Sequence, residues 1–349
     1  MALAADGPCP GRGWKEIPLA GEAELFRDFA RDIVGYQNED AAGSGPLRGF
    51  HAKIHTGAIA EFHVMADLPD HARHGVFAVP RVFPALVRFS NGDSRANPDS
   101  RHEPRGIAIK LIGIPGRKLL PGQEGAATQD FLATSHSVTS TVRDVTQFMA
   151  FVRAARVRKG LFGKLRRSIG LWETLRILNA LLWTVGFSRV RSMATEHFSS
   201  TAPIKFGPYA VKFTVQPAEG TAAPANIPLT DDFLRRELAD RLRKADLVLD
   251  FMVQFYLDDI RTPIENTSVR WLEKHAPKLK VAQLRIPRCD LDDQRSLELS
   301  AKIEKLSFNP WHATEDHRPL GNVMRARRVA YEASAAYRDH SAEPTSLPL

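Results

Sequence analysis

Short strand-like runs, rich in hydrophobic residues and bounded by turn signals, predict a chain built largely of short strands. Seven runs have this pattern, at residues 50–66, 77–90, 105–113, 129–134, 207–216, 246–258 and 278–286. Turn-forming pairs such as Asn91-Gly92 and Pro121-Gly122 separate the early runs. Because strand follows strand without a helix between each pair, we expect antiparallel pairing in a barrel or a strongly curled sheet.

A helical pattern occupies three other segments. Residues 15–40 carry a rough apolar stripe, a long basic section covers about 141–190, and 321–339 follows a glycine. The small-residue stretch 41–49 predicts a loop. The predicted class is therefore α+β, an antiparallel sheet with a helical insertion and a helical end.

Composition indicates a globular chain with a substantial core. The 349 residues are 43% hydrophobic and 25% charged, which excludes wholesale disorder. Cys9 and Cys289 form no C-x-x-C pair, so a disulfide framework and a thiolate zinc site are excluded. The start of the sequence lacks a secretory signal pattern, and the most apolar window, 175–187, is too short to span a bilayer. From this we expect a cytoplasmic protein.

The chain is basic, with 48 Lys and Arg against 40 Asp and Glu and a formal charge of +8. Between residues 153 and 191 ten basic side chains stand against one acid, Glu173. This section suits either an anionic lipid surface or a helix that packs on the barrel with a wet basic face, and we favour the second reading. It contains no nucleic-acid recognition motif, so we expect no nucleic-acid partner. P-loop, G-x-G-x-x-G, G-x-S-x-G and H-E-x-x-H motifs are absent from the sequence.

The last helical segment carries chemistry on one face. Arg327, Tyr331 and Arg338 are spaced by four and seven residues, which places them together. A guanidinium one turn away favours the phenolate, and a phenolate is a hard anionic ligand suited to ferric haem iron. Arg338 is suited to hold a haem propionate. The alternative is a solvated basic helix with one tyrosine packed inward.

Two early segments hold further candidates. Arg48 lies three residues before His51, and a histidine there is either a proton shuttle or a structural residue. Arg88 and Ser90 share one strand face. If that face is buried, Arg88 requires an anionic partner. The alternative is an edge strand whose polar face leaves both side chains in water. His51 and His55 share a spacing that suits a metal, but no third ligand accompanies them, so we discount that site.

Four motifs in order resemble the haem catalase superfamily, and most of all the compact catalase-related peroxidases. They are Phe50-His51-Ala52-Lys53, Val87-Arg88-Phe89-Ser90, Glu103-Pro104-Arg105-Gly106-Ile107-Ala108-Ile109-Lys110 and Arg327-x-x-x-Tyr331. The resemblance implies an antiparallel β-barrel of the catalase type over 46–340, with a helical insertion at about 141–200 and C-terminal helices. A helical arm (1–45) precedes it and a tail (341–349) follows it.

The resemblance also implies a role for each candidate residue around haem b. It makes His51 the distal histidine, Ser90 its orienting partner, Tyr331 the iron ligand, Arg327 the residue that holds the phenolate, and Arg48, Arg88 and Arg338 the propionate ligands. The implied enzyme is a haem peroxidase that cleaves the O–O bond of hydrogen peroxide or organic peroxides through a high-valent iron intermediate. It takes a peroxide and an unidentified electron donor, and homo-oligomers are expected. Peripheral membrane contact is not the favoured expectation.

One departure from the family pattern bears on the reaction. Catalases carry a distal asparagine in a G-N-N-T-P stretch, and here the run is Gly125-Ala126-Ala127-Thr128-Gln129. Ala127 cannot donate a hydrogen bond, and Gln129 replaces the amide only if the register differs by two. We therefore expect weak or no catalase activity. A fatty-acid hydroperoxide lyase or isomerase, a true catalase, and a haem or lipid carrier without activity remain alternatives.

Overall fold

The computed structural model describes most of the chain. The described residues are 10–41, 47–135, 141–156, 160–183, 190–224, 228–339 and 343–348. Cys9 lies outside them, and Cys289 is a free thiol.

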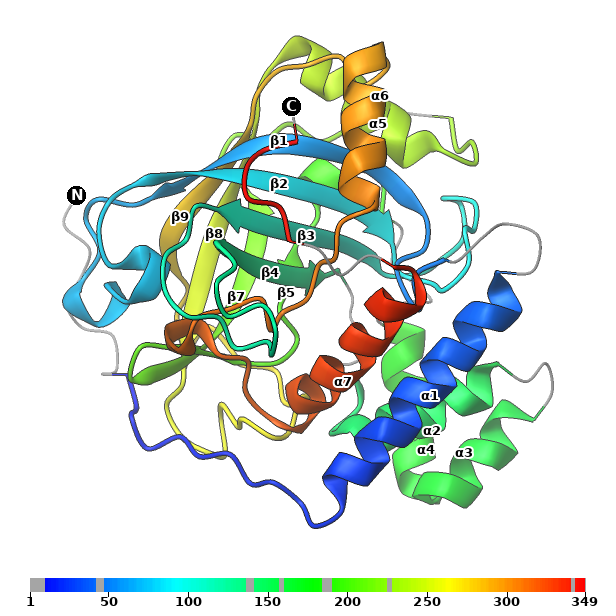
Figure 1. Ribbon diagram of the computed structural model, residues 1–349. Helices are drawn as coiled ribbons and strands as arrows, with labels where there is room; N and C mark the ends of the chain where they lie inside the picture. The colour runs from blue at the N-terminus through cyan, green and yellow to red at the C-terminus, as the bar shows by residue number, and fades with distance from the viewer. Residues whose placement is uncertain are drawn as a thin grey trace.

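The described strands form one antiparallel sheet that closes on itself. They are β1 (Ile54–Val64), β2 (Val82–Asn91), β3 (Arg105–Ile112), β4 (Thr128–Thr134), β5 (Phe198–Ser199), β6 (Ile204–Phe206), β7 (Tyr209–Pro217), β8 (Leu247–Phe255) and β9 (Leu279–Ile286). Their order is β5-β4-β3-β2-β1-β9-β8-β7-β6, and a further β5–β7 pairing joins the two ends (Figure 1). The predicted antiparallel barrel is confirmed.

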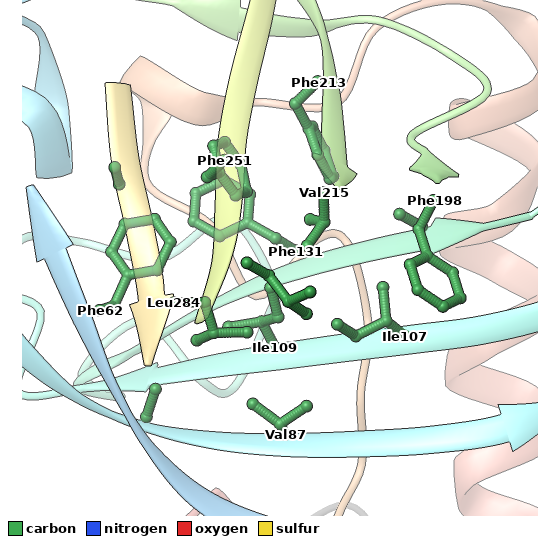
Figure 2. Close-up of a cluster of buried hydrophobic side chains, with 14 of the residues drawn as sticks. Phe62, Val87, Ile107, Ile109, Phe131, Phe198, Phe213, Val215, Phe251 and Leu284 are labelled. Atoms are coloured by element: carbon green, nitrogen blue, oxygen red, sulfur yellow. The ribbon is translucent and has the colours of Figure 1, made fainter. Parts of the chain in front are cut away.

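Aromatic side chains fill the interior of the barrel. Phe62, Phe131, Phe213 and Phe251 come from four different strands and are at most 2% exposed (Figure 2). The ring centroids of Phe131 and Phe251 lie 5.0 Å apart, and those of Phe213 and Phe251 lie 4.9 Å apart. Because these rings fill the lumen, a large ligand has to bind outside it.

The outer face of the barrel is also covered where β2 runs. Val87 and Phe89 of β2 point into the core, while Leu86 packs outward against Ile303 of a helix that lies across β1 and β2. The strand is therefore buried on both faces over most of its length.

The described helices lie mainly beside the barrel. They are α1 (Glu22–Asp40), α2 (Val145–Ala155), α3 (Leu161–Ile169), α4 (Leu171–Leu181), α5 (Phe233–Lys244), α6 (Gln294–Glu304) and α7 (Asn322–Tyr337). Helices α1 and α7 pack side by side, with α2, α3 and α4 next to them, while α6 packs on β1 and β2 at the other end of the view (Figure 1). Phe26, Phe29 and Ile33 of α1 share a buried cluster with α2 and α7. No described helix combines the length and hydrophobicity that a bilayer crossing requires.

Candidate haem-binding cavity

A cavity of about 1000 Å³ lies between the barrel and the helical layer. Its walls include parts of β2, β3 and β4 on one side and of α1, α2, α4 and α7 on the other. This volume is at the upper end of the range for ligand sites in proteins. The seven site residues expected from the sequence all line it: Arg48, His51, Arg88, Ser90, Arg327, Tyr331 and Arg338.

His51 is held in an uncommon backbone conformation just before β1. Its φ is 59°, in the left-handed region that side chains other than glycine rarely adopt. The His51 carbonyl accepts a hydrogen bond from an Arg88 Nη2 at 2.8 Å, and its amide donates to the Gly92 carbonyl at 3.3 Å. The sequence pattern places His51 inside a strand, and the structure corrects this because β1 begins only at Ile54.

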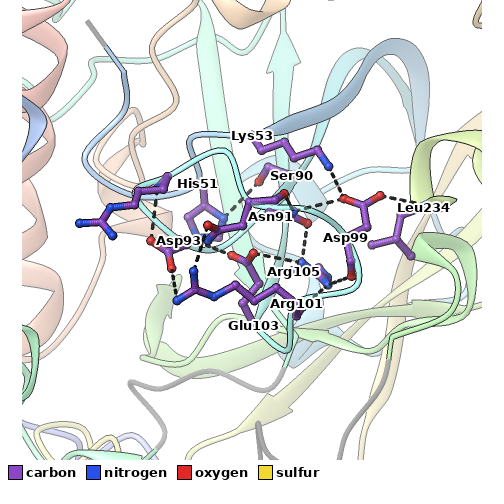
Figure 3. A network of polar contacts seen from close by, with 12 residues as sticks. His51, Lys53, Ser90, Asn91, Asp93, Asp99, Arg101, Glu103, Arg105 and Leu234 are labelled. Carbon is purple, nitrogen blue, oxygen red and sulfur yellow. Dashed lines mark hydrogen bonds and ion pairs between the residues drawn. The ribbon is translucent and has the colours of Figure 1, made fainter. Parts of the chain in front are cut away.

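The imidazole of His51 is oriented by Ser90 and is neutral. Its Nδ1 lies 3.1 Å from Ser90 Oγ (Figure 3). Burial, together with the positive charges of Arg88 and Arg327, lowers the pKa of His51 to about 3. A neutral imidazole at pH 7 is able to accept a proton.

Gly106 of β3 leaves the space that the His51 ring occupies. A Cβ atom at this position would lie 2.4 Å from His51 Nδ1 and 2.9 Å from Ser90 Oγ. Real Cβ atoms essentially never approach other atoms this closely, so any larger residue would displace the ring. This accounts for the glycine in the Glu103–Lys110 motif.

Tyr331 faces the cavity from α7 and is paired with Arg327. An Arg327 Nη2 donates a hydrogen bond to Tyr331 Oη at 2.7 Å, and the guanidinium carbon lies 4.9 Å from the ring centroid. The spacing of four residues on one helix places the two side chains one turn apart, as the sequence predicts. This hydrogen bond orients the phenol oxygen at the wall of the cavity.

Arg48 and Arg88 share a carboxylate, that of Glu304. Arg48 Nε lies 3.0 Å from Glu304 Oε1, and Arg88 Nε lies 2.6 Å from Oε2. Burial opposes ionisation of Glu304, but the Arg88 and Arg48 charges outweigh it and lower the pKa of the carboxyl. Burial, together with the nearby Arg88 charge, lowers the pKa of Arg48 to about 9.

Arg338 completes this cationic wall at the end of α7. Burial lowers its pKa to about 10. Among the described residues, its buried Nε has no hydrogen-bond partner. A buried guanidinium nitrogen without an acceptor is costly, so this position favours an anionic ligand.

Glu304, which pairs with Arg48 and Arg88, is a residue of this site that the sequence analysis misses. It ends α6, which packs closely on β1 because Gly57 leaves room for Ile303 and donates its N–H to Ser300 Oγ at 2.9 Å. A signal for this helix is present, since the Asp293 side chain caps it by accepting from the Ser296 amide. The approach of Glu304 to Arg48 spans 256 residues and is not visible in any local pattern.

His55 does not line the cavity and contacts the polar network through Asn91. Its Nε2 lies 2.8 Å from Asn91 Oδ1. Asn91 also contacts Asp99 and Arg105, and Lys53 pairs with Asp99 (Figure 3). Burial lowers the pKa of His55 to about 4, although Asp99 acts in the opposite direction. His55 does not line the cavity with His51, which agrees with discounting a metal site for this pair.

Gln129 does not replace the distal amide. It is buried in β4, where its Oε1 accepts a hydrogen bond from the Thr314 amide at 3.2 Å. Neither Gln129 nor Ala127 lines the cavity, and β4 contributes Leu132, Ala133 and Thr134 instead. The idea that a register shift brings Gln129 to the distal side is therefore wrong.

Comparison with known proteins agrees with this architecture. Catalase A from Saccharomyces cerevisiae matches 97% of this chain and 69% of its own, with a TM-score of 0.64 and 16% identity. A bacterial catalase also matches 97% of this chain and 64% of its own, with a TM-score of 0.62 and 16% identity. A fungal catalase matches 97% of this chain and 67% of its own, with a TM-score of 0.63 and 17% identity. The chain therefore has the catalase fold.

Sequence comparison agrees with the fold, but its matches cover less of this chain than the structural matches do. A catalase-related peroxidase from Mycolicibacterium paratuberculosis is 27% identical over 271 residues, which are 73% of this chain and 78% of the relative. A catalase from Schizosaccharomyces pombe is 32% identical over 95 residues, but the match spans only 16% of its length. No family model matches the chain. The expected resemblance to the haem catalase superfamily and its catalase-related peroxidases is confirmed.

Proposed function

We propose that this chain is a haem-dependent peroxidase that cleaves the O–O bond of hydrogen peroxide or of an organic peroxide. The observation that carries the proposal is the pairing of two groups around one cavity of about 1000 Å³. The barrel side supplies a neutral imidazole, that of His51 held by Ser90, and α7 supplies the Tyr331 phenol held by Arg327. Similarity to a catalase-related peroxidase supports a peroxide-cleaving oxidoreductase in general terms.

The charges of the wall that Arg48, Arg88 and Arg338 form fit the propionates of haem b. Three guanidinium groups, those of Arg48, Arg88 and Arg338, stand near the single carboxylate of Glu304, which leaves a charge of +2. Haem b carries two propionates, and the unpartnered Nε of Arg338 provides a donor for one of them. Tyr331 Oη is suited to ligate ferric iron, and Arg327 holds it by a hydrogen bond.

Haem, once bound, would supply the redox-active iron, and side chains of the protein would transfer the proton. With Nδ1 protonated toward Ser90 Oγ, His51 keeps Nε2 free to take the proton of the peroxide and return it to the leaving oxygen. Acid–base help of this kind is typically worth about 10²–10⁴-fold in rate.

The distal wall favours peroxidase over catalase chemistry. Ala127 and Gln129 lie away from the cavity, so neither supplies the amide that catalases use beside their histidine. We therefore propose that an organic electron donor, and not a second hydrogen peroxide, completes the cycle.

Substitution of His51 tests the proposal. His51→Ala retains haem but loses about 10²–10⁴-fold in peroxide-dependent dye oxidation. His63→Ala is the matched control, because His63 pairs with Glu61 on β1 and does not line the cavity. Full turnover in His51→Ala would contradict the mechanism, and a haem-loaded wild type with no turnover would indicate a carrier.

One observation favours a second candidate reaction on the same haem. Leu161 of α3 and Leu178, Leu181 and Leu182 of the α4 region line the cavity, which gives it an apolar side suited to an acyl chain. Product analysis with linoleic acid hydroperoxide separates the candidates. A fatty-acid hydroperoxide lyase or isomerase yields rearranged products without a donor, whereas a peroxidase yields the alcohol and oxidised donor.

A further inference from the structure

The outward face of α4 is apolar, which is the reverse of an ordinary surface helix. Trp172 is 81% exposed and Trp183, just beyond the helix, is 67% exposed. Leu171, Leu175 and Leu182 are exposed as well. At 100° per residue these five positions fall on one side of the helix, so they form a continuous apolar strip and not scattered exposed residues.

The inward face of α4 is apolar too. Thr174 and Ile177 are fully buried, and Leu178 and Leu181 line the cavity. The inner side of the helix therefore packs against the rest of the protein, and the outer leucines and tryptophans lie outside the core. One helix forms both the cavity wall and the apolar strip.

A cationic helix directly precedes the strip. Lys164, Arg166 and Arg167 lie on α3, directly before α4, and among the described residues none of the three forms an ion pair. The acid of the segment, Glu173, is already paired with Arg143 at 2.6 Å and with Arg176 at 2.8 Å. Exposed tryptophan and leucine flanked by unpaired Lys and Arg is the composition of helices that lie in the headgroup layer of a membrane.

We propose that the α3–α4 surface docks onto an anionic lipid bilayer. This surface comprises Phe162, Leu171, Trp172, Leu175, Leu182, Trp183, Lys164, Arg166 and Arg167. Phospholipid acyl chains accept the apolar strip, and anionic headgroups neutralise the three cations. A second copy of the chain fits less well, because a two-fold contact would bring the same unpaired cations of both copies together.

Docking places the wall of the cavity at the bilayer surface. Leu182 belongs both to the exposed strip and to the cavity lining, so the two features are continuous. A peroxide dissolved in the bilayer would then reach the cavity without crossing water. The docking itself does not depend on the proposed reaction.

Vesicle co-sedimentation with the full-length haem-loaded chain tests the proposal. The probes are vesicles of phosphatidylcholine alone and vesicles that contain about a quarter phosphatidylglycerol. We expect binding to the anionic vesicles with a blue shift of tryptophan fluorescence, little binding to phosphatidylcholine alone, and a loss of about fivefold per charge in Arg166→Gln and Arg167→Gln.

The decisive variant is the double substitution Trp172→Glu with Leu175→Glu. It should lower binding at least about tenfold and leave dye oxidation unchanged, because neither residue lines the cavity. Leu297→Glu on α6 is the matched control, since Leu297 and Leu175 are both 44% exposed. Equal binding of the double variant would overturn the proposal. So would a dimer in sedimentation velocity that the double variant dissociates, because a second copy would then cover the strip.

Discussion

A single methyl group at Gly106 should disable the proton-transfer apparatus without touching any reacting residue. The added Cβ would lie 2.4 Å from His51 Nδ1, whereas ordinary van der Waals contact begins at 3.4 Å. The imidazole must therefore move by about 1 Å or rotate away. The backbone of Gly106 is ordinary β3 strand, so alanine itself is compatible with its conformation.

The expected loss follows from this displacement. A misplacement of about 1 Å in a catalytic group costs about 10²-fold in rate. The Cβ would also lie 2.9 Å from Ser90 Oγ, so the serine cannot follow the ring to its new position. Overpacking of this kind typically lowers the free energy of unfolding by about 1–3 kcal/mol, so the variant should still fold. Haem binding should be retained because Tyr331 and Arg327 lie on α7 and are not among the nearest atoms that the added Cβ would meet.

Steady-state peroxide-dependent dye oxidation, normalised to haem content, measures the effect. Gly125→Ala is the matched control, since no atom lies within 4 Å of a Cβ built there. We expect Gly106→Ala to lose about 10²-fold in kcat with an unchanged visible spectrum, and Gly125→Ala to behave as the wild type. Wild-type turnover in Gly106→Ala would refute the claim that His51 must stay in its observed position.

Three further predictions address the ligand, the cationic wall and pH. Tyr331→Phe removes the phenol oxygen and should purify with little haem or with altered visible absorption; an unchanged spectrum would indicate another ligand. Glu304→Gln leaves Arg48 and Arg88 without their shared anion, and urea unfolding of the haem-free chain should show a free energy of unfolding lower by about 2 kcal/mol. This loss is smaller than for a fully buried pair because the Glu304 side chain is 32% exposed. The loss should be smaller still once hemin is added. The folded chain lowers the pKa of His55 to about 4, below the unfolded value of about 6.5, so the unfolded state gains its proton first and stability falls as pH drops through this window. Between pH 8 and pH 5, the free energy of unfolding should fall by about 2 kcal/mol less in His55→Gln than in the wild type. An equal fall in both proteins would contradict this assignment.

Local patterns predict the barrel because each long strand carries its own signal. The predicted runs at 105–113 and 278–286 differ by one residue at most from β3 and β9. The two- and three-residue strands β5 and β6 are too short to show a period, and yet β5 closes the barrel through its pairing with β7.

The site divides in the same way between local and long-range information. The Arg327–Tyr331 hydrogen bond follows from spacing on one helix, so the sequence predicts it. The backbone conformation of His51 and the close approach of its ring to Gly106 depend on packing between β1, β2 and β3. A periodic pattern in the sequence does not predict either of them. Glu304 reaches Arg48 and Arg88 only because α6 docks on β1.

Titration of the purified haem-free chain with hemin, followed by visible absorption, tests the central claim most directly. The cavity that joins Tyr331 to His51 predicts saturation at one hemin per chain, with a spectrum that changes in Tyr331→Phe and persists in His51→Ala. A spectrum that remains that of free hemin, or the same spectrum in Tyr331→Phe as in the wild type, would contradict the account.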